Sequence, residues 1–175
     1  METHKVCSFF GHRKINHSLQ LEKTLALTIE NLIIKENVKT FLFGSKSEFD
    51  KLCLKIVTNL KDKYPFIKRV SYSCKSESAI LEKEKDDLEK TLNVLLKRTV
   101  NLLCVDEEFE YKNKYVTGKS SYIQRNIAMI NDSNFCVFYY DINYKPNTSK
   151  NSGTKIAYNY AVKSNKQVIN IKELI

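Results

Sequence analysis

The sequence lacks the features that would place the chain in a membrane or mark it for export. No segment approaches the roughly 20 consecutive apolar residues that a membrane-spanning helix requires. The first apolar run, residues 6–10, is too short to be the hydrophobic core of a signal peptide. We therefore expect a cytoplasmic protein that has no membrane partner.

Paired cysteines and metal-binding spacings are missing as well. The five cysteines are scattered and contain no C-x-x-C pair, so we expect buried, reduced thiols that act as small hydrophobic residues. Cys7 and His12 are close in sequence, but a thiol buried in the middle of a strand would be out of reach of a substrate. All three histidines lie within the first 17 residues, and none has a zinc-type spacing to a cysteine pair. We expect neither a metal site nor a bound cofactor.

Two standard phosphate-binding motifs are also absent. Neither G-x-G-x-x-G nor a Walker A sequence occurs, so a standard NAD site or P-loop is not supported. The formal net charge of +9 favours an anionic partner. Most of this excess is lysine spread along the chain, without an arginine-rich block. A nucleic-acid partner is therefore an alternative, less favoured than a small anionic ligand.

The sequence does contain a regular alternation of two kinds of segment. Short, continuous apolar runs, typical of buried strands, occupy residues 5–10, 40–43, 67–72, 101–105, 134–140 and 167–171. Apolar residues with a helical period occupy residues 18–33, 49–60, 88–96, 120–130 and 156–161. The first helix is expected to end near Asn37, and Ser120 or Ser121 is expected to cap the fourth. Residues 106–119 and 141–152 are polar and are expected to be loops.

This alternation indicates the fold class. Strands that alternate with helices, and that are apolar on both faces, are typical of a parallel sheet covered on both sides. The chain of 175 residues is long enough to bury the core of one domain, and no linker or internal repeat divides it. We predict a single α/β domain over residues 1–175. It is a doubly wound, Rossmann-like domain with a mostly parallel sheet covered by helices on both faces.

Glycine, hydroxyl and basic side chains gather where the expected strands end and helices begin. In doubly wound sheets, ligands bind beyond the carboxyl ends of the strands, beside helix N-termini whose free amides attract anions. Glycine lets the backbone approach a ligand closely, and cations neutralise phosphate. The segments concerned are Gly11-His12-Arg13, Gly44-Ser45-Lys46 followed by Glu48 and Asp50, Arg125-Asn126, and Ser152-Gly153-Thr154.

Each of these signals has a plain structural alternative. A serine at a helix start is an ordinary cap, and an acidic residue in the first turn is favoured by the helix dipole alone. Arg125, between Ile123 and Ile127, is as readily an exposed residue on a helix surface. The argument for a site comes from several such segments meeting at one edge of one sheet.

These motifs, in this order, resemble the SLOG superfamily of Rossmann-like nucleotide-binding proteins, above all its YpsA-like branch of bacterial and phage proteins. The resemblance extends over nearly the whole chain except about residues 73–119. Two departures stand out: Gly44 is a single glycine where relatives often have a glycine-rich loop, and Ser152 stands where glycine is usual. The Pro-Gly-Gly-x-Gly-Thr-x-x-Glu sequence of the phosphoribohydrolase branch is missing. The matching segments are 7–13, 41–50, 60–68, 124–133, 152–161 and 168–171.

The resemblance implies a pocket for a nucleotide-derived ligand, such as an ADP-ribose-like molecule or a cyclic nucleotide. Superfamily members include proposed sensors of nucleotide signals in bacterial conflict systems and enzymes that cleave ribose from a base monophosphate. The turns and the resemblance together give the expected ligand-binding residues Gly11, His12, Arg13, Gly44, Ser45, Lys46, Glu48, Arg125, Asn126, Ser152, Gly153 and Thr154.

Three functions follow as expectations. The first is a sensor or sequestering protein that binds a small nucleotide at the carboxyl edge of the sheet. The second is an N-glycoside hydrolase or transferase acting on a nucleoside monophosphate or related nucleotide. In that enzyme, Glu48 or Asp50 would stabilise the ribose cation or activate water, while Arg13 and Arg125 hold the phosphate. The third is a DNA-processing accessory protein. Each is compatible with a homo-oligomer.

Overall fold

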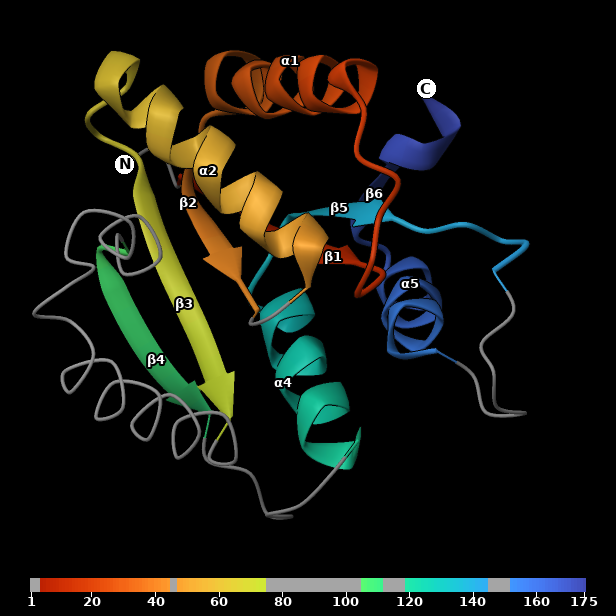
Figure 1. The fold of residues 1–175 in the computed structure, drawn as a ribbon. Helices are drawn as coiled ribbons and strands as arrows, with labels where there is room; N and C mark the ends of the chain where they lie inside the picture. The colour runs from red at the N-terminus through yellow and green to blue at the C-terminus, as the bar shows by residue number, and fades with distance from the viewer. Residues whose placement is uncertain (1–3, 45–46, 75–104, 112–118, 145–151) are drawn as a thin grey trace, which may run out of the picture.

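The strand β1 (Lys5–Gly11) lies at the centre of the sheet in this computed structural model, which describes residues 4–44, 47–74, 105–111, 119–144 and 152–175 (Figure 1). The strand order is β4-β3-β2-β1-β5-β6, and each neighbouring pair is parallel. This arrangement confirms the predicted doubly wound α/β fold. The remaining strands are β2 (Val38–Phe43), β3 (Lys68–Cys74), β4 (Glu107–Tyr111), β5 (Phe135–Tyr139) and β6 (Gln167–Asn170).

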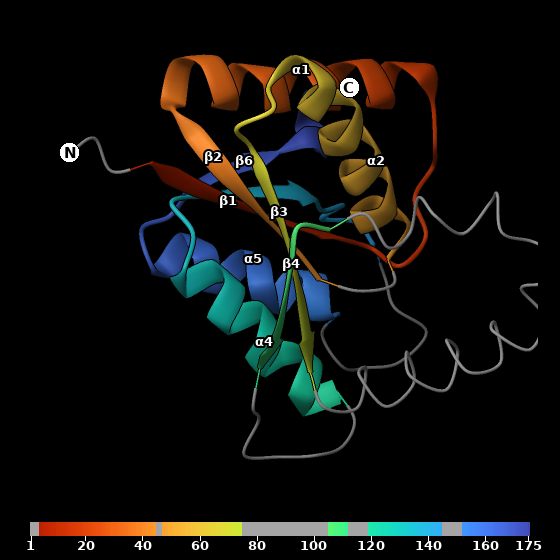
Figure 2. The ribbon, with the colours of Figure 1, turned by 90° about the vertical axis from the view of Figure 1, so that its left-hand side faces the viewer.

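Helices cover both faces of this sheet (Figures 1 and 2). The helices α1 (Leu19–Glu36) and α2 (Glu48–Lys63) pack on one face. The helices α4 (Lys119–Asn131) and α5 (Gly153–Lys163) pack on the other. A short 3-10 helix, η2 (Ile171–Glu173), follows β6 and lies beside α1.

Apolar strand residues alternate between the two cores. Phe9 of β1 packs into the core under α1 and α2, whereas the next residue, Phe10, packs into the core over α4 and α5. The same alternation continues in β5, where Val137 joins the first core and Phe138 the second. Because successive side chains of a strand point to opposite faces, a continuous apolar run fills both cores.

Serines define three of the helix starts. The Oγ of Ser18 accepts a hydrogen bond from the backbone N–H of Leu21 at 3.1 Å, and Ser47 and Ser152 cap α2 and α5 in the same way. These caps satisfy amides that the helix cannot pair internally. As predicted, α1 ends at Asn37, whose left-handed backbone (φ 56°) is a common helix terminator.

The edge strand β4 corrects the prediction that residues 106–119 form a loop. Residues 107–111 pair in parallel with β3. Their sequence, Glu-Glu-Phe-Glu-Tyr, carries no apolar run because the strand is largely exposed. Of the other residues in this expected loop, 112–118 lie outside the described residues. The predicted helix at 88–96 and most of the predicted strand at 101–105 also lie outside them, and Val105 is not in a strand.

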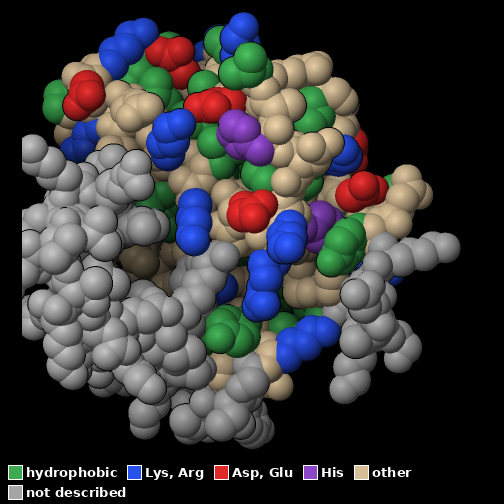
Figure 3. Space-filling model, in the orientation of Figure 1, with side chains coloured by type: hydrophobic (Ala, Val, Ile, Leu, Met, Phe, Trp, Pro, Cys, Tyr) green, Lys and Arg blue, Asp and Glu red, His purple; other side chains and the backbone are tan. Residues whose placement is uncertain are grey.

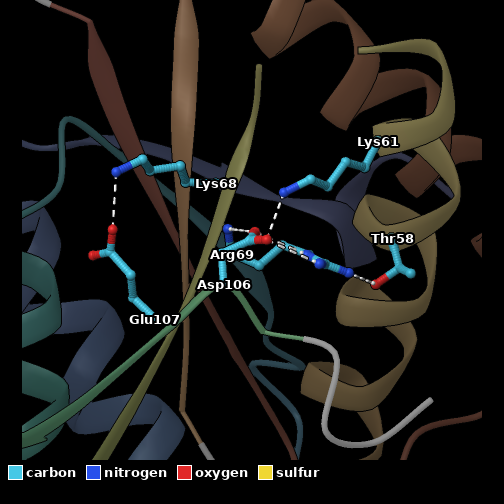
Figure 4. Close-up of polar contacts among 6 residues, drawn as sticks. All are labelled: Thr58, Lys61, Lys68, Arg69, Asp106 and Glu107. Atoms are coloured by element: carbon cyan, nitrogen blue, oxygen red, sulfur yellow. Dashed lines mark hydrogen bonds and ion pairs between the residues drawn. The ribbon is translucent and has the colours of Figure 1, made fainter. Parts of the chain in front are cut away.

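An ion-pair cluster attaches β4 to its neighbours (Figure 4). The guanidinium of Arg69, on β3, donates two hydrogen bonds of 3.1 Å to the carboxylate of Asp106, just before β4. Lys61 of α2 also donates to Asp106, and Thr58 Oγ accepts from Arg69 at 3.1 Å. Burial alone would raise the pKa of Asp106, but the hydrogen bonds from Arg69 and Lys61 outweigh it and hold the pKa well below its usual range.

The fourth helix also begins differently from the prediction. It starts at Lys119, so Ser120 and Ser121 lie inside the first turn of the helix and not at the N-cap position before it; Ser121 is buried there. The helix predicted from the apolar period around Ile123 and Ile130 is present. Met129 and Ile130 are fully buried, whereas Ile127 is only partly buried.

The described cysteines agree with the expectation of buried thiols. Cys7, Cys53, Cys74 and Cys136 are free and buried, while Cys104 lies outside the described residues. Burial raises the pKa of the Cys7 and Cys53 thiols well above the ordinary value, so neither is a ready nucleophile. Among the helices described, none has the length and apolar character needed to cross a membrane.

Candidate functional site

The carboxyl ends of β1 and β5 form the point at which the chain winds in opposite directions. From β1 the chain continues toward β2 on one side, and the later strand β5 pairs with the other side of β1. The loops that follow these two strands therefore diverge and leave space between them. This topological switch point is where doubly wound sheets bind their ligands.

A cleft of about 390 Å³ opens at this edge of the sheet. Its lining comes from Arg13 after β1, from Gly153 at the start of α5, and from one side of α4. Lys and Arg side chains gather near the middle of this face of the molecule, between α2, α4 and α5 (Figure 3). The residues from α4 are Lys119, Tyr122, Ile123 and Asn126.

Three of the predicted ligand-binding residues thus meet in one cleft: Arg13, Asn126 and Gly153. The sequence reasoning missed the other lining residues. Tyr122 and Ile123 precede Asn126 by four and three positions, so all three lie on the same side of the helix. Extending the helix face backward from Asn126 would have identified them.

Arg125 is only 5% exposed, which excludes the alternative of an exposed helix residue, and it lies behind this cleft, outside its described lining. Its Nε and Nη2 donate to Asn126 Oδ1 at 3.3 and 3.0 Å, and its guanidinium lies 5.6 Å from the ring centre of Tyr122. A Cβ atom on Gly44 would be 3.0 Å from Nη2. Gly44 therefore leaves room for the guanidinium at the end of β2.

Gly11 has a packing role at the end of β1. A Cβ atom on this residue would lie 2.4 Å from the Cβ of Phe49, in the first turn of α2. The missing side chain allows α2 to begin directly against the end of β1. The close approach predicted from this glycine therefore occurs, but its partner in the structure is a helix of the same chain.

His12 joins the two diverging loops. The backbone N–H of Asp141, after β5, donates to His12 Nε2 at 3.1 Å, so Nε2 carries no proton. The ring of Tyr144 stacks on the imidazole with 4.2 Å between the ring centres. Burial lowers the pKa of His12, and the carboxylate of Asp141 offsets part of this effect. His12 does not belong to the described cleft lining.

The two candidate catalytic carboxylates form hydrogen bonds near the start of α2. Glu48 Oε2 accepts from the backbone N–H of Ile15 at 3.0 Å, which fixes the loop that follows β1. Asp50 is buried, and its Oδ2 accepts from the Ser47 hydroxyl at 2.9 Å. Neither carboxylate lies in the described cleft lining, which contains no acidic residue.

The turn before α5 contributes differently at each of its three predicted positions. Ser152 caps the helix, with its Oγ accepting from the N–H of Lys155 at 3.1 Å, and Thr154 is buried. Around Gly153, no atom of the described residues lies within 4 Å of the place a Cβ would occupy. Gly153 also lines the cleft, so the start of α5 borders it. The predicted residues Ser45 and Lys46 lie outside the described residues.

The described residues give no basis for a metal site, since no three of their His, Cys, Asp and Glu side chains come together in a way that could bind an ion. A scan against models of known protein families finds no match for the chain, and neither does a search of curated proteins. The resemblance to the SLOG superfamily therefore stays a prediction from the sequence motifs.

Proposed function

We propose that the cleft at the switch point binds a small phosphate-bearing nucleotide or nucleotide-derived signal, and that the protein acts as a sensor or sequestering protein. The observation that carries this proposal is the make-up of the cleft. The loop after β1, one side of α4 and the first residue of α5 converge on it with two cations, an aromatic ring and a helix N-terminus.

Each of these components suits one part of a nucleotide. Arg13 and Lys119 supply positive charge for phosphate oxygens, and the N-terminus of α5 at Gly153 adds the positive end of a helix dipole. Tyr122 offers a ring on which a base can stack. The cleft volume falls at the lower end of the roughly 300–1,000 Å³ typical of small-molecule sites.

Binding without turnover is favoured over the N-glycoside hydrolase alternative. That alternative requires a carboxylate beside the ribose, and its candidates, Glu48 and Asp50, lie outside the described lining. Both are engaged in local hydrogen bonds, Glu48 with the loop after β1 and Asp50 with the cap of α2. Both carboxylates therefore act as hydrogen-bond acceptors that stabilise the start of α2.

A thermal-shift screen tests the proposal. Nucleoside monophosphates, cyclic nucleotides, ADP-ribose and dinucleotides are added one at a time to the purified protein. A ligand at 100 times its Kd stabilises the folded state by about 2.7 kcal/mol, which raises Tm by roughly 5–10 °C in a domain of this size. We expect such a shift for at least one of them, together with its reduction in Arg13→Gln.

The matched control is Lys163→Gln, which removes a charge from the last turn of α5, at the opposite end of the helix from Gly153. It is expected to keep the full ligand-induced shift. The absence of a shift with every compound would contradict the proposed function, and equal losses in both variants would mean that only net charge matters.

A further inference from the structure

The contact between Arg125 and Asn126 determines which way the Asn126 amide faces. A guanidinium has hydrogen-bond donors only, so an amide that bonds to it must present its oxygen. Nε and Nη2 of Arg125 both donate to Asn126 Oδ1, at 3.3 and 3.0 Å. The amide nitrogen Nδ2 is thereby left on the side away from Arg125.

Asn126 also lines the cleft, whereas Arg125 is buried behind it. We infer that Arg125 holds Asn126 so that its Nδ2 faces the cleft, where it donates a hydrogen bond to an anionic oxygen of the ligand. Asn126 is then a specificity-determining residue and Arg125 its positioning residue. The inference rests on the proposed function and names the chemical group that the cleft recognises at this point.

The rest of the described lining agrees with this assignment. Arg13 and Lys119 add further nitrogen donors, and the six lining residues that the structure describes include no carboxylate. A phosphate oxygen can accept from all of them, whereas a cationic or donor-rich group at the same place would meet only like groups. The cleft therefore selects for an oxyanion beside Asn126.

The substitution Asn126→Asp separates binding from folding. The carboxylate has nearly the same shape as the amide and gives Arg125 a charged acceptor, so the contact behind the cleft is kept and strengthened. Toward the cleft, the same change replaces a donor by a negatively charged acceptor. We expect Tm without ligand to stay equal or rise, while affinity for an anion falls about tenfold or more.

The control is Asn131→Asp, which makes the same change of charge on the same helix. Asn131 is the last residue of α4, and its Oδ1 accepts from the hydroxyl of Tyr160 at 3.0 Å, an interaction that Asp preserves. Titration calorimetry with AMP and, separately, with inorganic phosphate measures the affinity of each protein. Loss of both ligands in Asn126→Asp assigns the phosphate oxygen, and loss of AMP alone assigns an acceptor elsewhere on the nucleotide, which overturns the oxyanion assignment.

A double-mutant cycle tests the positioning role of Arg125. Arg125→Met removes every donor while keeping much of the length and apolar volume of the side chain. If Arg125 acts through Asn126, Arg125→Met weakens AMP binding in the wild-type background but has little further effect in Asn126→Asp. The side-chain amide signals of Asn126 in NMR spectra of the free protein are also expected to shift in Arg125→Met.

The failures of the two proposals are distinguishable. Wild-type protein that binds neither probe nor any compound of the screen overturns the proposed function and this inference with it. If wild type binds AMP and Asn126→Asp binds it with the same affinity, the proposed function stands and this inference is overturned. A fall in the ligand-free Tm of Asn126→Asp, absent in Asn131→Asp, contradicts the orientation of the amide. If Arg125→Met does not fold, the comparison of Asn126→Asp with Asn131→Asp still tests whether the Asn126 amide binds the anion.

Discussion

Glycines at the carboxyl edge of the sheet differ in what surrounds them. Gly11 stands against Phe49 and Gly44 against the guanidinium of Arg125, while the described atoms leave the space beside Gly153 open. The first two glycines are explained by contacts within the protein. Of these three described glycines, only Gly153 lines the cleft, and its missing side chain serves no described internal contact.

Gly11→Ala is expected to destabilise the fold strongly. The added methyl would lie 2.4 Å from Phe49 Cβ, an atom fixed to the backbone of α2, so the helix itself must move away. Overpacking of this kind costs about 1–3 kcal/mol, which corresponds to a fall in Tm of roughly 2–12 °C. Gly153→Ala is the control, since it adds the same methyl where space is open. Equal Tm values for the two variants would contradict the packing role of Gly11.

Sequence reasoning could find the candidate residues but could not sort them by role. The sequence pattern placed Arg13, Asn126 and Gly153 near one sheet edge because parallel strands end together. It could not show that Arg125 is buried. The apolar residues around it do not form a helical pattern clear enough to assign a charged residue to the buried or the exposed face. Nor could it show that His12 bonds to Asp141, a contact between residues 129 positions apart.

At the scale of secondary-structure elements, β4 depends on a polar anchor because its own residues bury little surface. Arg69 is 9% exposed, and its guanidinium meets Asp106 through two parallel hydrogen bonds. Asp106 Oδ2 also accepts from the backbone N–H of Arg69 at 2.8 Å. The anchor therefore combines ion pairing with the backbone pairing that begins the strand (Figure 4).

Asp106→Asn is expected to lower the free energy of unfolding by about 2–3 kcal/mol, because it leaves the buried charge of Arg69 without its carboxylate. The pKa of Asp106 is depressed in the folded state, so its contribution is present above the ordinary value of 3.8 and is lost as the pH falls through the folded-state pKa. The difference between wild type and variant should therefore shrink in strong acid. Urea unfolding from pH 7 downward measures it.

The exposed pair between Lys68 and Glu107 provides the matched control for this experiment. Its side chains are 60% and 56% exposed, and ion pairs in water contribute little. Glu107→Gln is expected to leave the unfolding curve unchanged at every pH. A loss in Glu107→Gln as large as that in Asp106→Asn would show that β4 depends on general charge balance.

The elements themselves were largely predictable, with one instructive failure. Among the described residues, five strands and four helices were predicted correctly, because continuous apolar runs and the helical period reflect burial directly. β4 was missed because an edge strand with three glutamates among its five residues has no buried face to leave a pattern. Its pairing comes from contacts with β3 and α2 that are distant in sequence.

On the scale of the whole molecule, the sheet consists of two halves that meet at β1 and β5. These strands pair directly, from Cys7 with Phe135 to Gly11 with Tyr139. Beyond their ends, His12 continues the connection by accepting a hydrogen bond from the N–H of Asp141 and by stacking on Tyr144. The two loops that border the switch point are thus joined by one imidazole, which must be neutral to accept this bond.

His12 should therefore make the stability of the fold depend on pH. Because burial lowers its pKa in the folded state, its contribution is complete above the ordinary value of 6.5. It declines as the pH falls below that value, since the unfolded chain then binds a proton that the folded chain resists. His12→Phe keeps a ring for stacking but removes the acceptor, which costs about 1 kcal/mol at neutral pH and abolishes this titration.

His17→Gln, at an exposed histidine, is the control. Urea unfolding at pH 7, 6 and 5 should show a steeper loss of stability in wild type and His17→Gln than in His12→Phe. Parallel losses in all three would mean that other groups govern the response to acid and that the two halves of the sheet are joined without this hydrogen bond.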